Sequence, residues 1–188
     1  GHSEDRTREI ADGLGVRCVL DNKKGKGDAI RVGLAEAKGD VVVFIDADMS
    51  HDPREIPRLV EPIVKDGMDM VIGSRTLGGS DELFGDWDKL IRVIGSHIIT
   101  MSINYRYKVA LTDSQNGFRA IRRTAGLDIG MEEDIFTIEQ EMIMKLLKRG
   151  YKVTEVPSHE YARRYGESNI VVWKVAPRYL YSLIKGLI

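Results

Sequence analysis

The chain has 188 residues, of which 43% are hydrophobic, and this suffices to bury one sizeable core in a single domain. Its 28 lysines and arginines nearly balance 29 acidic residues. The net charge of -1 therefore excludes a global attraction to nucleic acid, and no local basic patch with interleaved aromatic residues is evident. One cysteine excludes an internal disulfide, and with 4 histidines the ligand spacing of a structural zinc site is absent.

The cysteine and the first residues set further expectations. Cys18 sits in an apolar run, so we expect it to be a small core residue in a protein of a reducing compartment. No signal peptide and no uninterrupted membrane-spanning segment is visible. The chain opens on Gly1-His2-Ser3 without a methionine, and we expect further residues to precede it in the gene product.

The first part of the chain alternates helix and strand signals, the pattern of a sheet with helices on its faces. Residues 6–12 are predicted to form a helix that ends at Gly13, and residues 16–20 a strand. Apolar positions at helical spacing predict a helix over 30–37, directly before an all-apolar strand at 41–45. These elements form a predicted βαβ unit, and the last strand is expected to be buried on both faces.

The alternation continues to the end of the chain. A helix after Asp52 carries an apolar stripe over 56–64, in which Pro57 and Pro62 predict a kink. A polar, Gly-rich stretch over 76–86 is predicted to be a mobile loop. Further strands are predicted at 68–72, 118–121 and 152–156, and further helices at 90–101 and 131–149. The last of these has acidic residues at its start and basic residues at its end, as the helix dipole favours.

The final segment, 170–188, is predicted to be an amphipathic helix. Its basic residues share one face with Tyr181 at about 100° per residue, and they are Lys174, Arg178 and Lys185. This pattern is typical of a helix on a membrane surface. It is equally typical of a packing helix with a solvated basic stripe, and Pro177 would then divide it into two parts.

Two carboxylates follow the apolar strand at 41–45. Asp46 and Asp48 project to the same side where the chain leaves the sheet, because side chains alternate along a strand. Such hard oxygen ligands suit Mg²⁺ or Mn²⁺, ions that commonly bring phosphates with them. Alternatively the carboxylates cap the next element, but Asp52, before Pro53, already provides that cap. The pattern therefore predicts a divalent metal site.

Several short motifs follow one another in a recognisable order. They are Gly25-Lys26-Gly27, Asp46-Ala47-Asp48-Met49-Ser50-His51, Gly73-Ser74-Arg75, Asp113-Ser114-Gln115-Asn116-Gly117-Phe118-Arg119, Glu141-Met142, Glu155-Val156-Pro157 and Arg163-Arg164-Tyr165-Gly166-Glu167-Ser168. Together they resemble the family 2 glycosyltransferases, above all the dolichol-phosphate mannose synthases and their prokaryotic polyprenyl-phosphate relatives. An Asp-x-Asp motif alone is weak evidence, whereas the ordered set covers about residues 1–169.

The resemblance implies a GT-A fold over 1–169, an α/β nucleotide-binding domain with a Rossmann-like, mostly parallel sheet and helices on both faces. The family's first strand and most of its second have no counterpart here. We therefore expect the N-terminal strand to be missing and one edge of the sheet to be unpaired. The segment 170–188 would follow as a membrane-associated helix, at the cytoplasmic face of the membrane.

The resemblance also implies roles for individual residues. Asp48 would hold Mg²⁺ or Mn²⁺ on the diphosphate of a nucleoside-diphosphate sugar, and Asp46 would lie nearer the ribose and base. The residues implied in catalysis are Asp48, Arg75 and Arg119, the arginines contacting phosphates through their fork geometry. The residues implied in substrate binding are Lys26, Gly27, Asp46, Glu141, Arg163 and Ser168. Asn116 and Asn169 depart from the family's usual Ser and Lys, and the second departure weakens a full diphosphate clamp.

In this interpretation a polyprenyl phosphate oxygen attacks the anomeric carbon of the sugar in line and inverts it, as the bond from that carbon to the nucleoside diphosphate breaks and the diphosphate leaves. A phosphate monoester has a second pKa near ~6, so the acceptor needs no strong general base, and the arginines screen its charge. The stretch 76–86 would act as a lid over the donor. No protein partner is implied.

Three alternatives remain open from the residues. The acceptor is a soluble phosphosugar, or the chain is a haloacid-dehalogenase-like phosphatase with Asp46 as nucleophile, or it is a non-catalytic nucleotide-binding module. Against the phosphatase, Ser50 stands where that family has Thr or Val, and helix and strand elements precede the motif. Whether the donor is a GDP or a UDP sugar also remains open.

Overall fold

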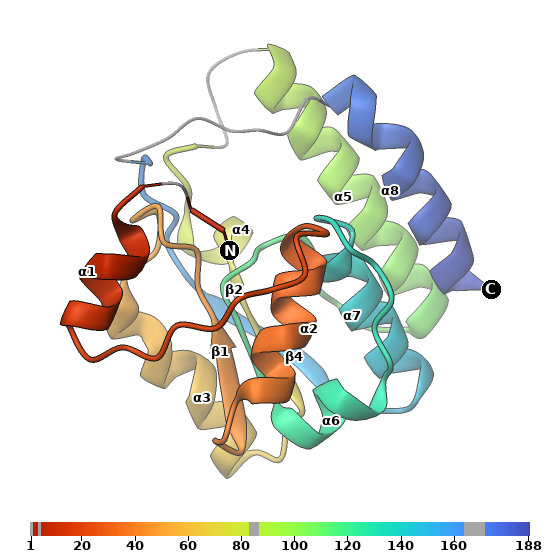
Figure 1. The fold of residues 1–188 in the computed structure, drawn as a ribbon. Coiled ribbons are helices and arrows are strands. Elements are labelled where there is room, and N and C mark those ends of the chain that lie inside the picture. Colours follow the sequence, from red (N-terminus) through yellow and green to blue (C-terminus); the bar gives the residue numbers. More distant parts are fainter. Residues whose placement is uncertain (1, 4, 83–86, 164–171) are drawn as a thin grey trace.

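The computed structural model describes residues 2–3, 5–82, 87–163 and 172–188, and these form a four-stranded sheet covered by helices (Figure 1). The strands are β1 (Val41–Phe44), β2 (Met70–Ser74), β3 (Arg119–Arg122) and β4 (Val153–Pro157), in the order β1-β3-β2-β4. β3 pairs antiparallel with β1 and β2, whereas β2 and β4 are parallel. β1, β2 and β4 therefore run in one direction and β3 runs against them, so the described sheet is mixed. The predicted α/β class is confirmed, whereas the predicted mostly parallel sheet has one parallel and two antiparallel pairings among its described strands.

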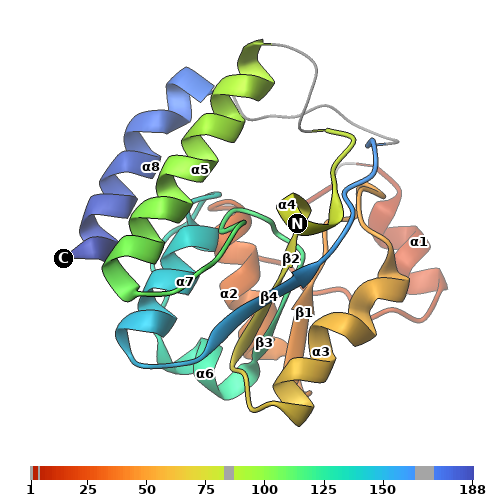
Figure 2. The ribbon, with the colours of Figure 1, turned by 180° about the vertical axis from the view of Figure 1, so that it is seen from behind.

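Helices lie on both faces of this sheet, as predicted (Figure 2). They are α1 (Thr7–Gly13), α2 (Lys26–Glu36), α3 (Ile56–Lys65), α4 (Arg75–Gly78), α5 (Trp87–Tyr107), α6 (Arg123–Asp128), α7 (Ile138–Lys148) and α8 (Val172–Leu187). On one face, Leu59 and Ile63 of α3 pack against Phe118. The other face is covered by α2, α6 and α7, and α5 and α8 pack together beside α7.

The strand β2 is buried along its whole length, because it lies between β3 and β4 and is covered on both faces. Met70 and Ile72 belong to the core shared with α2 and α7, whereas Val71 belongs to the core shared with α3. This alternation follows from the two-residue period of a strand. The continuous apolar run of β2 is therefore explained by helices on both of its sides.

The N-terminal part of the sheet differs from the prediction. Residues 16–20 form no strand in the described part of the chain, and Val16, Cys18 and Leu20 are exposed. A strand needs a neighbour for its backbone hydrogen bonds, and no described strand pairs with this segment. The predicted βαβ unit and the core position of Cys18 are therefore wrong. β1 is half-buried instead of fully buried, because it is an edge strand that pairs with β3 alone among the described strands.

The predicted helix over 131–149 is also shorter than expected, since α7 begins at Ile138. Residues 131–134 are instead an irregular segment that lies against the start of α2. There the Gly27 N–H donates a hydrogen bond to the carbonyl of Asp134 (2.8 Å). The Glu141 carboxylate accepts hydrogen bonds from two backbone N–H groups of the same segment. These tertiary contacts outweigh the preference of acidic residues for a first helical turn.

The prolines do not interrupt the helices in which they lie. Asp52 caps a 3₁₀ turn at 53–55, accepting a hydrogen bond from one of its backbone N–H groups (2.9 Å), and α3 follows directly. Pro57 lies in the first turn of α3, where its missing N–H costs nothing, and Pro62 lies inside the helix. α8 continues through Pro177.

Candidate functional site

Asp48 lies just beyond the carboxyl end of β1 and has both carboxylate oxygens engaged. Its Oδ1 accepts hydrogen bonds from the N–H (3.1 Å) and hydroxyl (2.6 Å) of Ser50, and its Oδ2 lies 2.8 Å from Arg163 Nε. Partial burial opposes ionisation, but the hydrogen bonds from Ser50 and the charge of Arg163 lower the pKa of Asp48 below its usual value. The predicted metal ligand is thus an ionised carboxylate that faces a cation.

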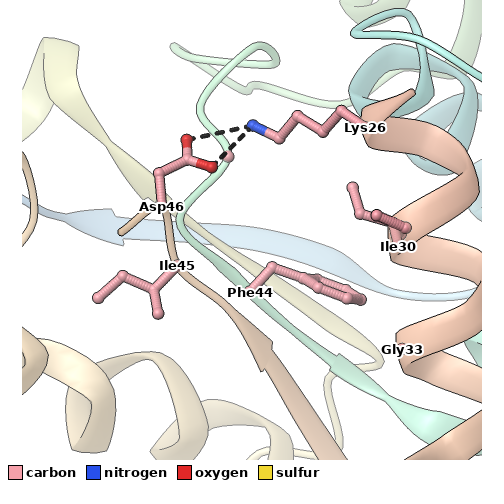
Figure 3. Close-up of a pocket in the computed structure, with 8 residues that line it drawn as sticks. Lys26, Ile30, Gly33, Phe44, Ile45 and Asp46 are labelled. Atoms are coloured by element: carbon pink, nitrogen blue, oxygen red, sulfur yellow. Dashed lines mark hydrogen bonds and ion pairs between the residues drawn. The ribbon is translucent and has the colours of Figure 1, made fainter. Parts of the chain in front are cut away.

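Asp46 faces a second cation, Lys26, in the first turn of α2 (Figure 3). Lys26 Nζ lies 3.1 Å from Asp46 Oδ1 and 3.0 Å from Glu139 Oε1. Burial disfavours the ammonium, but the carboxylates of Glu139 and Asp46 outweigh it and raise the pKa of Lys26. Lys26 therefore links the end of β1 to the first turn of α7.

Glu139 is a site residue that the sequence motifs did not indicate. Its side chain is 5% exposed, and its Oε2 has no hydrogen-bond partner among the described residues. The family resemblance implied Glu141 instead, but residues two apart on a helix point to different faces. In the sequence, Glu139 follows the largely apolar run Ile135-Phe136-Thr137-Ile138 but precedes Gln140 and Glu141, so no local pattern singles it out. Its burial does, because a buried carboxylate requires a specific partner.

An open pocket of about 260 Å³ lies beside the Lys26–Asp46 pair. Its lining residues are Lys26, Ala29, Ile30, Gly33, Phe44, Ile45, Asp46 and Gly117. Figure 3 shows Phe44 and Ile30 on the apolar side of the pocket and the ion pair at its charged end. A Cβ on Gly117 would lie 2.8 Å from Lys26 Nζ and 3.0 Å from Asp46 Oδ2, so a larger residue here would make the ends of these two side chains shift. The pocket suits a ligand with an apolar ring and a polar end.

Gly27 packs against the protein itself. Its N–H donates to the carbonyl of Asp134, and a Cβ at this position would lie 2.1 Å from the carbonyl oxygen of Glu133. Any larger residue would therefore push α2 away from the irregular segment at 131–134. The glycine is required by this contact, and through it sets the position of the neighbouring Lys26.

Arg75 begins α4 and is 17% exposed. Its Nε and Nη2 lie 2.7 Å and 3.1 Å from the carboxylate oxygens of Asp113, and its Nη1 lies 3.4 Å from Glu160. Burial opposes both charges, yet the pair raises the pKa of Arg75 and lowers that of Asp113. The Arg75 guanidinium was expected to contact phosphate, but its two parallel donors are instead taken by the carboxylate of Asp113.

Arg119 is 1% exposed and lies under the site. Its guanidinium donates to the backbone carbonyls of Asn116 (2.9 Å from Nε), Glu139 (3.0 Å) and Ser114 (3.4 Å). Burial lowers its pKa. The structure thus places Arg119 as a tie between the loop before β3 and the start of α7, and does not place it as an open cation for a phosphate.

The remaining predicted residues are spread over the molecule. Glu141 accepts hydrogen bonds from the backbone N–H groups of Glu132 (2.9 Å) and Glu133 (2.8 Å) and pairs with Lys145 (2.9 Å), so it stabilises the irregular segment. Arg163 meets Asp48, as described above. Ser168 lies outside the described residues. The structure therefore brings together Lys26, Asp46, Asp48 and Arg163 at the end of β1.

The residues at this place fit a divalent cation that shares its coordination with a ligand. Asp46 and Asp48 supply hard carboxylate oxygens, and each already faces a cationic side chain. Within residues 2–3, 5–82, 87–163 and 172–188, no group of three or more Asp, Glu, His or Cys side chains is placed to hold a metal. An ion that keeps water and phosphate oxygens as its other ligands, as Mg²⁺ does, matches two carboxylates.

The basic face of α8 packs partly against the protein. Arg178 Nη2 lies 2.8 Å from the buried Glu133 carboxylate, and Lys185 Nζ lies 2.6 Å from Glu132. Arg178 and Lys185 thus pair with acidic residues of the same chain while each remains half-exposed. None of the helices in the part of the chain that the structure describes has the length and apolarity to cross a bilayer.

Exposed apolar residues instead gather on α5 and α8. Those of α5 recur every three or four positions and so share one side of the helix, and they are Trp87, Leu90, Ile94, Ile98, Met101 and Tyr105. Those on α8 include Trp173, Leu180 and Ile184. The two helices lie side by side (Figures 1 and 2), and hydrogen bonds from Arg106 and Tyr107 to Leu187 and Gly186 join their C-terminal ends. We call these nine residues the α5–α8 apolar set.

Known proteins resemble this chain in both sequence and fold. The chain is 34% identical over 192 residues to the dolichol-phosphate mannosyltransferase of Pyrococcus furiosus, a match that covers 97% of this chain and 53% of that protein. It is 33% identical over 167 residues to glycosyltransferase AglJ of Haloferax volcanii, with 88% of this chain and 54% of that protein covered. The chain thus spans about half the length of these two relatives.

A solved structure of glucosyl-3-phosphoglycerate synthase from Mycobacterium tuberculosis, in complex with Mn²⁺, UDP and phosphoglyceric acid, superposes with a TM-score of 0.72. The match covers 98% of this chain and 64% of that one at 20% identity, so it shows the fold alone, and the expected GT-A fold is confirmed. The family model described as glycosyl transferase family 2 matches residues 1–130. The chain belongs to glycosyl transferase family 2.

Proposed function

We propose that the chain transfers a sugar from a nucleoside-diphosphate sugar to a polyprenyl phosphate, with Mg²⁺ or Mn²⁺ held at Asp46 and Asp48. The observation that carries the proposal is the pair of carboxylates at the end of β1, each facing a cation and lying beside an open pocket. Relatives named for transfer to dolichyl and undecaprenyl phosphate, at 29–34% identity, support the acceptor class. Family membership argues against a dehalogenase-like phosphatase.

The donor would occupy the pocket with its nucleoside. Phe44 and Ile30 offer an apolar side for the base, and Asp46 accepts hydrogen bonds from ribose hydroxyls while Lys26 keeps its carboxylate in place. Asp48 and Arg163 lie at the place of the diphosphate. A bound divalent ion would neutralise the negative charge of the departing diphosphate, and Asp48 would be a ligand of that ion.

The remaining residues orient the site. Glu139 fixes Lys26, Arg119 fixes the loop at 114–116, and the Arg75–Asp113 pair fixes α4 beside it. The acceptor phosphate is largely dianionic at neutral pH, since its second pKa is near ~6, so its oxygen attacks the anomeric carbon without a protein base. Positioning two anions in line is then the main task of these side chains.

The acceptor lipid requires a membrane surface near the site. The α5–α8 apolar set provides exposed tryptophan, leucine and isoleucine side chains on adjacent helices, as expected of helices that lie in a bilayer interface. We place the chain at the cytoplasmic face of the membrane, as a peripheral protein, because nucleoside-diphosphate sugars and dianionic polyprenyl phosphate would meet there.

A transfer assay tests the proposal. The purified 188-residue chain is incubated with GDP- and UDP-sugars, Mn²⁺ and either polyprenyl phosphate or a soluble phosphosugar, and lipid-linked and soluble products are measured by mass spectrometry. Asp48→Asn is expected to lower transfer by about 100-fold or more, because the isosteric amide loses the negative charge. Asp52→Asn is the matched control, since asparagine caps a helix as well as aspartate does and transfer should be retained.

Each result has a distinct meaning. Undiminished transfer by Asp48→Asn would contradict the metal role of this carboxylate. Transfer to the phosphosugar but not to polyprenyl phosphate would mean that the acceptor is a soluble molecule and not a lipid. Calorimetric binding of donors without transfer to either acceptor would identify a nucleotide-binding module.

A further inference from the structure

Arg163 pairs with one oxygen of the Asp48 carboxylate, which the proposed metal needs. Its Nε lies 2.8 Å from Asp48 Oδ2, while Oδ1 is held by Ser50. The Asp48 side chain is 21% exposed and that of Arg163 is 33% exposed, so this pair is better shielded from water than most surface pairs. Without another cation, the guanidinium is the counter-ion of Asp48.

The backbone around Arg163 holds the guanidinium in this position. The Tyr161 N–H donates to the carbonyl of Ser50 (2.8 Å), which ties the segment to the turn after the metal motif. On its other side, the N–H groups of Ala162 and Arg163 donate to the carboxylates of Asp81 (3.2 Å) and Glu82 (3.0 Å). The segment is therefore fixed to both neighbours, and its arginine reaches Asp48 from a defined place.

A divalent ion and the guanidinium cannot both be accommodated at Oδ2 without conflict. Mg²⁺ binds carboxylate oxygen at ~2.1 Å, which would bring it close to a positively charged group that is already 2.8 Å from the same oxygen. This repulsion favours displacement of the arginine by the ion. The displaced guanidinium remains beside the ion, where its five N–H donors suit the diphosphate that arrives with the donor.

We propose that Arg163 is a placeholder at Asp48, that is, a cationic side chain that occupies the position of the divalent ion until the ion binds. The ion then displaces the Arg163 guanidinium, which binds the diphosphate of the donor instead. This deepens the proposed function and rests on it. The exchange makes metal binding weak in the absence of nucleotide, because the ion pair must be broken. It makes metal and nucleotide binding mutually favourable, since the freed arginine gains a new anionic partner.

Two titrations with opposite expected outcomes test the proposal. In the first, Mn²⁺ alone is titrated and the free ion is measured by electron paramagnetic resonance. Arg163→Met is expected to bind Mn²⁺ about fivefold or more tightly than the wild type, because no ion pair is broken. In the second, UDP or GDP is titrated calorimetrically at saturating Mn²⁺, and Arg163→Met is expected to bind it more weakly. A variant that is merely misfolded would weaken both.

Controls separate this exchange from a general change of charge. Arg54→Met removes an arginine that is 90% exposed and pairs with Asp52 in the adjacent turn, and it should alter Mn²⁺ binding by no more than about twofold. Arg163→Lys keeps the charge and should resemble the wild type in the first titration. When Asp48→Asn is introduced into both the wild type and Arg163→Met, the difference in Mn²⁺ affinity between them should disappear.

A direct readout uses the Arg163 Nε–Hε resonance, assigned by its loss in Arg163→Met. Saturating Mg²⁺ is expected to shift it, and Asp48→Asn is expected to shift it in the absence of metal, because both remove the contact between Arg163 and Asp48. Two results would overturn the placeholder role and leave the proposed function standing. One is Mn²⁺ binding that depends on Asp48 but is not tightened by Arg163→Met. The other is an Arg163 resonance that does not shift on addition of Mg²⁺. Mn²⁺ binding that is equal in wild type and Asp48→Asn would overturn the metal site, and the placeholder role with it.

Discussion

Arg119 shows how a charged side chain can serve the site without facing it. Its guanidinium is enclosed and donates to the carbonyls of Ser114, Asn116 and Glu139. Without Arg119, the buried loop carbonyls of Ser114 and Asn116 would lose this donor, which is costly. The arginine therefore stabilises the loop that carries Gly117 beside the Lys26–Asp46 pair.

Arg119→Met is expected to lower the free energy of unfolding by at least about 2 kcal/mol, because buried carbonyls lose their donors. Urea unfolding followed by circular dichroism measures the effect. Arg54→Met, at an exposed position, should stay within about 0.5 kcal/mol of the wild type. If Arg119→Met is stable and loses only its affinity for phosphate-containing substrates, the result would instead support a direct contact between Arg119 and phosphate.

At the scale of an element, the first turn of α2 depends on the segment at 131–134. Gly27 leaves no room for a Cβ, which would lie 2.1 Å from the Glu133 carbonyl oxygen. Gly33, on the same helix, has no atom within 4 Å of a Cβ position. Gly27 lies in the first turn of α2 and Gly33 in its interior, and only Gly27 meets another segment of the backbone, so the two glycines can be compared within one helix.

Gly27→Ala is expected to destabilise the protein by about 1–3 kcal/mol, because backbone must move away from backbone. Gly33→Ala is expected to stabilise it by about 0.5–1 kcal/mol, since alanine favours an exposed helix interior. Urea unfolding of both variants gives the comparison. Equal effects of the same sign would show that α2 is not fixed by the contact at Glu133.

For the molecule as a whole, the α5–α8 apolar set lies on helices packed together at one side of the domain, whereas α3 covers the opposite face of the sheet (Figure 2). Ile98 on α5 is 57% exposed and Val64 on α3 is 69% exposed. Both are apolar and both are accessible. They differ in whether further exposed apolar residues recur along the same side of their helix, as they do on α5.

Ile98→Asp combined with Ile184→Asp is expected to weaken binding to phosphatidylglycerol-containing vesicles by about tenfold or more, because apolar burial is replaced by a charge. Vesicle co-sedimentation measures the partition. Val64→Asp adds the same kind of charge to α3 and should have little effect. Equal losses in both proteins would mean that the surface charge alone controls the partition and that α5 and α8 do not contact the bilayer.

The sequence by itself determined the alternating α/β architecture, the strands β2, β3 and β4, and the carboxylates at the end of β1. Those features depend on local apolar periodicity and on the order of residues along one strand, which a linear pattern contains. The tertiary structure alone decided which charges meet. It pairs Arg163 with Asp48, encloses Arg119, and brings the unforeseen Glu139 to Lys26. It also leaves residues 16–20 without strand partners among the described strands, and α7 begins at Ile138 instead of residue 131. The reason is that backbone hydrogen bonds and ion pairs join segments that are far apart in the chain, and no local sequence pattern contains their proximity.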